Sequence, residues 1–175
     1  MDHTDHVRLL RDGIPGAGGA WADLGSGAGA FTLALADLIG ISGRIYSIDR
    51  DEDALDDQKR AMQARFHAVA VNYVAADFTL PLTLPPLDGA IMANALHFVR
   101  DKEAVVRGIH ALLRPGGRLI LVEYNADRGN AWVPYPLSYS SWESLARRSG
   151  FAQTRLLATT PSRFLGEIYS AVSFK

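Results

Sequence analysis

The fold of this chain is decided by one stretch, Trp21-Ala22-Asp23-Leu24-Gly25-Ser26-Gly27-Ala28-Gly29-Ala30-Phe31. An apolar run ends at the acid Asp23, and three alternating glycines then lead into a second apolar run. Glycines at this spacing allow a tight turn from strand to helix and let a ligand approach the backbone. The start of the helix directs unpaired N–H groups and the positive end of its dipole toward that ligand. Since a carboxylate lies at the mouth of this pocket, a cationic ligand is favoured over a pyrophosphate.

Two classes of ligand fit this loop, and so does a purely structural turn that binds nothing. The spacing Gly25-x-Gly27-x-x-Ala30 matches the dinucleotide fingerprint, which permits alanine at its last position. The spacing Asp23-x-Gly25-x-Gly27-x-Gly29 instead suits a ligand that carries positive charge and no phosphate. A glycine loop alone does not choose among these, so the rest of the chain has to decide.

The composition excludes several classes of protein. The chain has 175 residues with 18 Lys and Arg against 19 Asp and Glu, so we expect one domain without a broad electrostatic surface for nucleic acid or an anionic membrane. It contains no cysteine, which removes disulfides, thiolate metal sites and a cysteine nucleophile and fits the reducing cytoplasm. No apolar run approaches the roughly 18 residues of a membrane span, and the polar start is unlike a signal peptide.

From residue 20 onward, the chain alternates apolar strands with helices. We predict residues 1–19 to be a short helix or arm and residues 20–175 to be the core. The strands are expected at 20–24, 43–49, 69–75, 87–94 and 118–124, and the helices at 29–39, 51–66, 101–113 and 140–149. This alternation predicts a doubly wound α/β fold with a parallel sheet and right-handed crossovers.

The last two β-type runs, at 151–159 and 167–174, differ from the others. Only about seven residues separate them, and a parallel crossover needs roughly ten or more. We therefore expect an antiparallel C-terminal hairpin. Two local signals complete the prediction: a turn at 115–117 (Pro-Gly-Gly), and a helix start at Ser140 with capping-box spacing to Glu143.

Polar residues end four of the predicted strands: Asp23, Asp49, Asp77 and Asn94. In a doubly wound sheet, ligands bind outside these carboxyl ends. Asp49 follows Gly29 by twenty residues, the distance at which an acid ending the second strand can bind ribose hydroxyls. Each of these acids is also compatible with an ordinary turn or helix-capping role.

The order of the motifs resembles that of the class I S-adenosylmethionine-dependent methyltransferases, in particular their small type 11 and type 25 domains. The resemblance is carried by the segment from Asp23 to Gly29, by Ala76-Asp77-Phe78, and by 113–119 (Leu-Arg-Pro-Gly-Gly-Arg-Leu) before the fifth strand. It covers about residues 20–124, and the hairpin extends it to the end. It implies a mostly parallel seven-stranded sheet in the order 3-2-1-4-5-7-6.

The resemblance also implies roles for individual residues toward S-adenosylmethionine. The loop residues Asp23, Gly25, Ser26, Gly27 and Gly29 would surround the methionine portion. Asp49 would bind the ribose, and Asp77 with Phe78 the adenine. Arg50 would either cover the adenine or be solvated, and Asn94 would either accept a bond from the ligand's amino group or only cap its strand.

The sequence says less about the residues that would bind the substrate that accepts the methyl group. His97 follows the fourth strand and is our candidate catalytic base, although a histidine among apolar neighbours is also compatible with simple packing. The aromatic segment 124–142 is expected either to form the wall for a small, partly apolar substrate or to cover the sheet edge. The fourth strand lacks an Asn-Pro-Pro-aromatic motif, which disfavours a nucleic-acid base. No metal site is expected.

Three functions are therefore open at this stage: methyl transfer to a small molecule, a non-catalytic module that binds the cofactor, and a nicotinamide-dependent oxidoreductase. The last lacks a Tyr-x-x-x-Lys pair and a second substrate domain. The sequence leaves open whether the pocket is exposed or covered by a second subunit in a homodimer.

Overall fold

The computed structural model describes residues 1–175 and contains seven strands and five α-helices. The strands are β1 (Gly19–Leu24), β2 (Gly43–Asp49), β3 (Ala70–Ala75), β4 (Leu87–Ala93), β5 (Leu113–Tyr124), β6 (Gln153–Ser162) and β7 (Gly166–Phe174). The helices are α1 (His3–Arg11), α2 (Ala30–Ile39), α3 (Glu52–Arg65), α4 (Lys102–Leu112) and α5 (Tyr139–Arg148), with a short 3-10 turn η1 (Leu96–Phe98) after β4.

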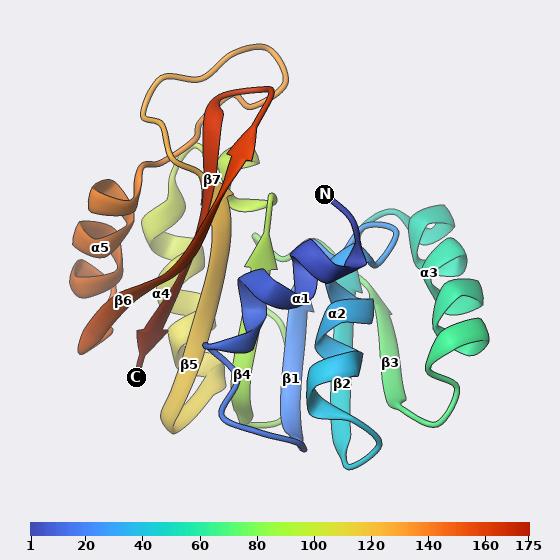
Figure 1. The fold of residues 1–175 in the computed structure, drawn as a ribbon. Coiled ribbons are helices and arrows are strands. Elements are labelled where there is room, and N and C mark those ends of the chain that lie inside the picture. The colour runs from blue at the N-terminus through green and yellow to red at the C-terminus, as the bar shows by residue number, and fades with distance from the viewer.

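All strands join one sheet in the order β3-β2-β1-β4-β5-β7-β6 (Figure 1). The pairs from β3 to β5 are parallel, whereas β7 runs antiparallel to both β5 and β6. This confirms the strand order implied by the resemblance and the antiparallel hairpin predicted from the short final connection. The hairpin loop is shorter than expected because both of its strands extend further toward the turn.

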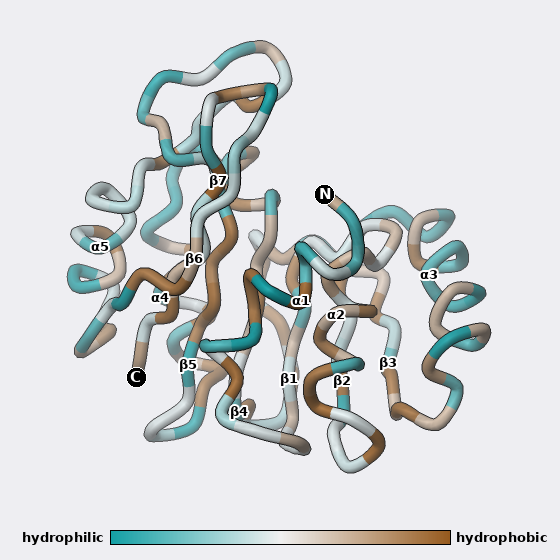
Figure 2. Tube along the Cα trace, in the orientation of Figure 1, coloured by the Kyte–Doolittle hydropathy of each residue, from teal (hydrophilic) through white to brown (hydrophobic).

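Two helical layers cover the sheet. One face packs its apolar residues against α4 and α5 around the fully buried Trp142. The other face packs against α1, α2 and part of α3 around Trp21, which is 1% exposed. Apolar residues follow the central strands and α2, while hydrophilic residues recur in α1 and in the loop between β5 and α5 (Figure 2). None of the helices combines the length and apolar character needed to cross a membrane.

The topology places the glycine loop beside the ends of three strands. β1 lies between β2 and β4 in the sheet. The strands that follow β1 are added first on one side of it (β2 and β3) and then on the other (β4 and β5). A crevice forms at such a point, outside the carboxyl ends of the strands. Gly29 precedes α2 with φ +88°, a left-handed conformation that favours glycine.

Two local predictions were wrong. The expected turn at 115–117 lies within β5, because Leu113 already pairs with Leu87 and the register shifts before Arg118 pairs with Gly89. Helix α5 is capped by Ser138, not by Ser140: the Ser138 side chain accepts a hydrogen bond from the Ser141 amide. The Ser140–Glu143 spacing fits a capping box, but the chain reaches helical geometry one residue before Ser140.

Candidate functional site

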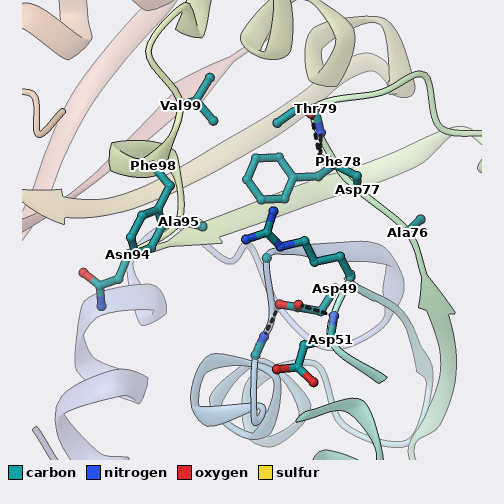
Figure 3. A pocket seen from close by; sticks show the side chains of 13 residues that line it. Asp49, Asp51, Ala76, Asp77, Phe78, Thr79, Asn94, Ala95, Phe98 and Val99 are labelled. Atoms are coloured by element: carbon teal, nitrogen blue, oxygen red, sulfur yellow. Dashed lines mark hydrogen bonds between the residues drawn. The ribbon is translucent and has the colours of Figure 1, made fainter. Parts of the chain in front are cut away.

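A cavity of about 440 Å³ opens at the carboxyl ends of β1, β2, β3 and β4 (Figure 3). Seven of the residues predicted from the sequence line it: Gly25, Gly27, Asp49, Arg50, Asp77, Phe78 and Asn94. Figure 3 shows Phe78 and the segment from Asn94 to Phe98 on different sides of the cavity, with Asp49 and Asp51 below them. Asp23, Ser26, Gly29 and His97 do not line it.

Asp49 connects the glycine loop to the end of β2. Its Oδ2 accepts a hydrogen bond of 2.7 Å from the Gly27 amide, and its Oδ1 accepts one of 3.0 Å from the Asp51 amide. A carboxylate oxygen can accept more than one bond, so Asp49 can still accept from ligand hydroxyls. An added Cβ on Gly27 would meet nothing within 4 Å, so the backbone there borders open space.

A buried polar network supports this loop from below. The Ser47 hydroxyl lies 2.7 Å from Ser26 Oγ and 2.9 Å from Gln58 Oε1, and both Ser47 and Gln58 are fully buried. A Cβ on Gly29 would collide with the Gln58 side chain, so the loop and α3 are in close contact. Ser26 and Gly29 therefore hold the loop in shape. Sequence reasoning missed Ser47 and Gln58, because neither belongs to a motif.

Asp23 lies behind the loop and not in the cavity. It is 1% exposed and accepts a hydrogen bond of 2.5 Å from the Thr32 hydroxyl of α2. Burial raises the pKa of Asp23 to about 7; the Thr32 bond opposes this shift, and the nearby Asp49 charge adds to it. In this arrangement Asp23 fixes the start of α2 to the end of β1.

The segment from Asp77 to Thr79 forms another wall of the cavity. Asp77 Oδ1 accepts hydrogen bonds from the Thr79 amide at 2.8 Å and the Thr79 hydroxyl at 2.7 Å, and these bonds lower the pKa of Asp77. Asp77 is therefore ionised at neutral pH. The ring of Phe78 lies beside it in the wall (Figure 3).

Asn94 provides a test of whether a cationic ligand fits. It adopts φ +52°, the only left-handed conformation among the non-glycine residues. Its Oδ1 is buried without a hydrogen-bond partner, although the residue lines the cavity. A buried acceptor without a donor is unfavourable. Once the Asn94 amide turns toward the cavity, an ammonium group there would supply the missing donor, so the residues present fit S-adenosylmethionine.

His97 lies on the turn η1, next to the cavity but outside its lining. The residue is 3% exposed, and its ring contacts the carboxylate of Glu123 near the end of β5. The neighbouring Phe98 lines the cavity, and its ring centroid lies 4.2 Å from that of His97. Sequence reasoning missed Glu123, Phe98 and Val99, because no spacing relates β5 to the turn after β4.

A doubly wound sheet with an antiparallel seventh strand and an acid-lined cavity at its switch point defines a Rossmann-like methyltransferase fold. The comparison with known families agrees, since the methyltransferase-domain family matches residues 22–121. The chain belongs to this family of class I S-adenosylmethionine-dependent methyltransferases.

The individual relatives share only a modest sequence identity with this chain. The arsenite methyltransferase of Aquipseudomonas alcaligenes is 29% identical over 160 residues, which are 79% of this chain and 46% of the relative. The 2-phytyl-1,4-naphtoquinone methyltransferase of Nostoc punctiforme is 28% identical over 110 residues, 62% of this chain and 48% of the relative. The chain thus spans about half the length of these curated relatives. The YcgJ protein of Bacillus has the same fold, with a TM-score of 0.80 at 14% identity over 99% of both chains.

Proposed function

We propose that this chain binds S-adenosylmethionine in the cavity at the end of β1 and transfers its methyl group to a small-molecule acceptor. The bound cofactor supplies a methyl group that its sulfonium has already activated. The protein's task is then to align the acceptor with that group and to exclude water.

The observation that carries this proposal is the set of polar groups around one cavity. Asp49 presents a carboxylate beside the glycine loop, Asp77 presents a second one, and Asn94 lines the cavity with an amide whose buried oxygen has no partner. These three acceptors suit ribose hydroxyls, an exocyclic amine and an ammonium group, respectively. A dinucleotide would instead bring phosphates toward two carboxylates, which is electrostatically unfavourable.

Two features support a small, uncharged or partly apolar acceptor. The chain is nearly neutral, with 18 basic and 19 acidic residues, so it offers no broad attraction for a polyanion. The side of the cavity next to η1 is apolar, with Ala95, Phe98 and Val99 in its lining. One of the relatives is named for arsenite, but this chain has no cysteine and offers no thiolate to a thiophilic acceptor.

The test is calorimetric titration of the protein with S-adenosylmethionine, S-adenosylhomocysteine and NADH, followed by incubation with methyl-labelled cofactor and pools of small metabolites. We expect binding of both adenosyl compounds, no binding of NADH, and label in an acceptor. Cofactor binding without label in any acceptor pool would favour a non-catalytic binding module. Binding of NADH alone would overturn the assignment of the cavity.

A further inference from the structure

Two loops project from the edge of the sheet at which the cavity opens (Figure 1). One connects β5 to α5, and the other is the hairpin turn between β6 and β7. β5 ends at Tyr124, but β6 and β7 remain paired up to Ser162 and Gly166, so the hairpin extends beyond the carboxyl end of β5. We refer to residues 128–136 and 162–166 of these two segments as the loop tips.

Large apolar side chains are exposed on both loop tips. Trp132 is 76% exposed and Tyr135 is 41% exposed on the first tip, and Phe164 is 63% exposed on the second. Phe98 of η1, which lines the cavity, is also 63% exposed. Half of the eight large hydrophobic side chains that the chain exposes therefore belong to η1 and the loop tips. Water is an unfavourable environment for so much aromatic surface in one region.

The backbone of the first tip is held in place by hydrogen bonds. Asn130 Oδ1 accepts bonds of 2.9 Å from the amides of Trp132 and Val133, which closes the end of the loop. The Tyr135 amide donates to the His97 carbonyl over 2.9 Å, which fixes the loop to η1. A preorganised loop loses little conformational freedom on binding, so the exposed Trp132 is presented at a low entropic cost.

The charged side chains of the loop tips are all positive. They are Arg128 on the first tip and Arg163 on the second. Both are exposed, and neither takes part in an ion pair. The neighbouring acids, Asp127 and Glu167, lie at the bases of the two loops, where each accepts a hydrogen bond. The tips therefore combine exposed aromatic rings with two cations that have no partner.

An anionic bilayer surface matches this combination. Tryptophan and tyrosine rings prefer the boundary between lipid headgroups and hydrocarbon, and other apolar rings enter it. Arginine can bury its stem there and keep its guanidinium among anionic headgroups. A globular protein would have to match two separate projections, whereas a bilayer meets both at once. The whole chain is nearly neutral, with 18 basic and 19 acidic residues, so the attraction has to be local.

We propose that the loop tips bind the surface of a bilayer that contains anionic lipids. Trp132 and Phe164 enter the headgroup layer, while Arg128 and Arg163 pair with lipid phosphates and carboxylates. This inference goes beyond the proposed function, because it concerns a second surface that acts with or without the cofactor. The cavity opens at the same edge of the sheet, so binding places its mouth beside the lipid.

The experiment is co-sedimentation of the full chain with lipid vesicles, in the absence of cofactor. The vesicles contain phosphatidylcholine alone or phosphatidylcholine and phosphatidylserine in equal parts. The salt concentration is about 0.1 M or about 1 M, which shortens the screening length from about 10 Å to about 3 Å. One variant combines Trp132→Ser with Phe164→Ser, and another combines Arg128→Gln with Arg163→Gln.

The control variant changes the opposite end of the sheet. It combines Ile41→Ser with Arg44→Gln, both at exposed positions at or just before the start of β2. Ile41 is 76% exposed, the same fraction as Trp132, so the control removes a comparably exposed apolar side chain and one cation. Thermal melts verify that each variant is folded.

We expect the wild-type chain to sediment with the anionic vesicles and to bind phosphatidylcholine alone more weakly. Removing the two aromatic rings should weaken binding by at least about tenfold. Removing the two arginines should weaken it by about 25-fold at low salt, or about fivefold for each, and by much less at high salt. The control variant should bind like the wild type.

Two results would overturn the proposal. The first is a wild-type chain that sediments with neither kind of vesicle, or a control variant that loses as much binding as the tip variants. The second comes from analytical ultracentrifugation without lipid: a wild-type dimer that the Trp132 and Phe164 substitutions dissociate would assign the loop tips to a second copy of the chain. Titration with S-adenosylmethionine is a separate measurement, and its failure would count against the proposed function alone.

Discussion

The Gly27 amide donates a 2.7 Å hydrogen bond to Asp49 Oδ2, so the loop after β1 is tied directly to the end of β2. The carboxylate that faces the cavity therefore also sets the shape of the loop that borders it. Binding and loop geometry depend on the same side chain at this point.

Replacing Asp49 by alanine should weaken binding of S-adenosylmethionine by about 1.5–3 kcal/mol, the range for a hydrogen bond to a charged group. The loss corresponds to roughly a tenfold to hundredfold increase in Kd. Calorimetric titration measures it, with Asp57→Ala, at an exposed acid of α3, as the control. Unchanged affinity in Asp49→Ala would remove Asp49 from the site.

Two glycines of the loop should respond differently to alanine. Both have positive φ, +52° at Gly27 and +88° at Gly29, so each substitution costs about 1–2 kcal/mol of backbone strain. Only Gly29→Ala also drives a methyl group into Gln58, which adds about 1–3 kcal/mol of overpacking. Urea denaturation should therefore show the larger loss of stability for Gly29→Ala, and equal losses would contradict this packing.

Gln58→Ala should lower the free energy of unfolding by about 1–3 kcal/mol, because it removes one of the two acceptors beside the buried Ser47 hydroxyl and leaves a gap under the loop. Gln63→Ala, at an exposed position of the same helix, should change stability by less than about 0.5 kcal/mol. Equilibrium denaturation of the two variants compares them. Similar free energies of unfolding for the two variants would show that the buried network of Ser47 and Gln58 does not stabilise the fold.

Asp23 makes stability depend on pH. Its pKa is raised to about 7 in the folded chain, so between about pH 4 and pH 7 the folded state keeps a proton that the unfolded state has lost. The free energy of unfolding contributed by this group consequently falls as pH rises through that window. Asp23→Asn does not titrate, and its stability relative to wild type should increase from pH 4 to pH 7 in thermal melts.

The control for this titration is Asp12→Asn, at an exposed position after α1. It measures how far replacing an exposed acid changes stability over the same pH range. A difference for Asp23→Asn that does not exceed the change in this control would mean that burial does not raise the pKa of Asp23.

The resemblance implied the strand order, and the residue pattern predicted seven of the thirteen residues that line the cavity. Asp49, Asp77 and Asn94 follow apolar runs, and parallel strands bring such positions to one edge of the sheet whatever the packing around them. Asp23 shows the limit of this argument. It also ends a strand, but its carboxyl is directed to Thr32 of α2 and not into the cavity.

The supporting contacts could not be predicted because they join residues with no fixed spacing. Gln58 reaches Ser47 from the middle of α3, and Glu123 reaches His97 across 26 residues. Both contacts depend on how helices and turns pack on the sheet, which periodicity does not report. The shift of the α5 cap from Ser140 to Ser138 has a similar origin, because competing serines lie two residues apart.

The three tryptophans divide between interior and surface in a way that provides an optical reporter. Trp21 and Trp142 are at most 1% exposed, whereas Trp132, in the loop after β5, is 76% exposed. A soluble quencher such as iodide therefore dims the emission of Trp132 selectively in the native protein. Any compound that binds over that loop should shield the Trp132 indole from iodide, so its binding can be followed without a label.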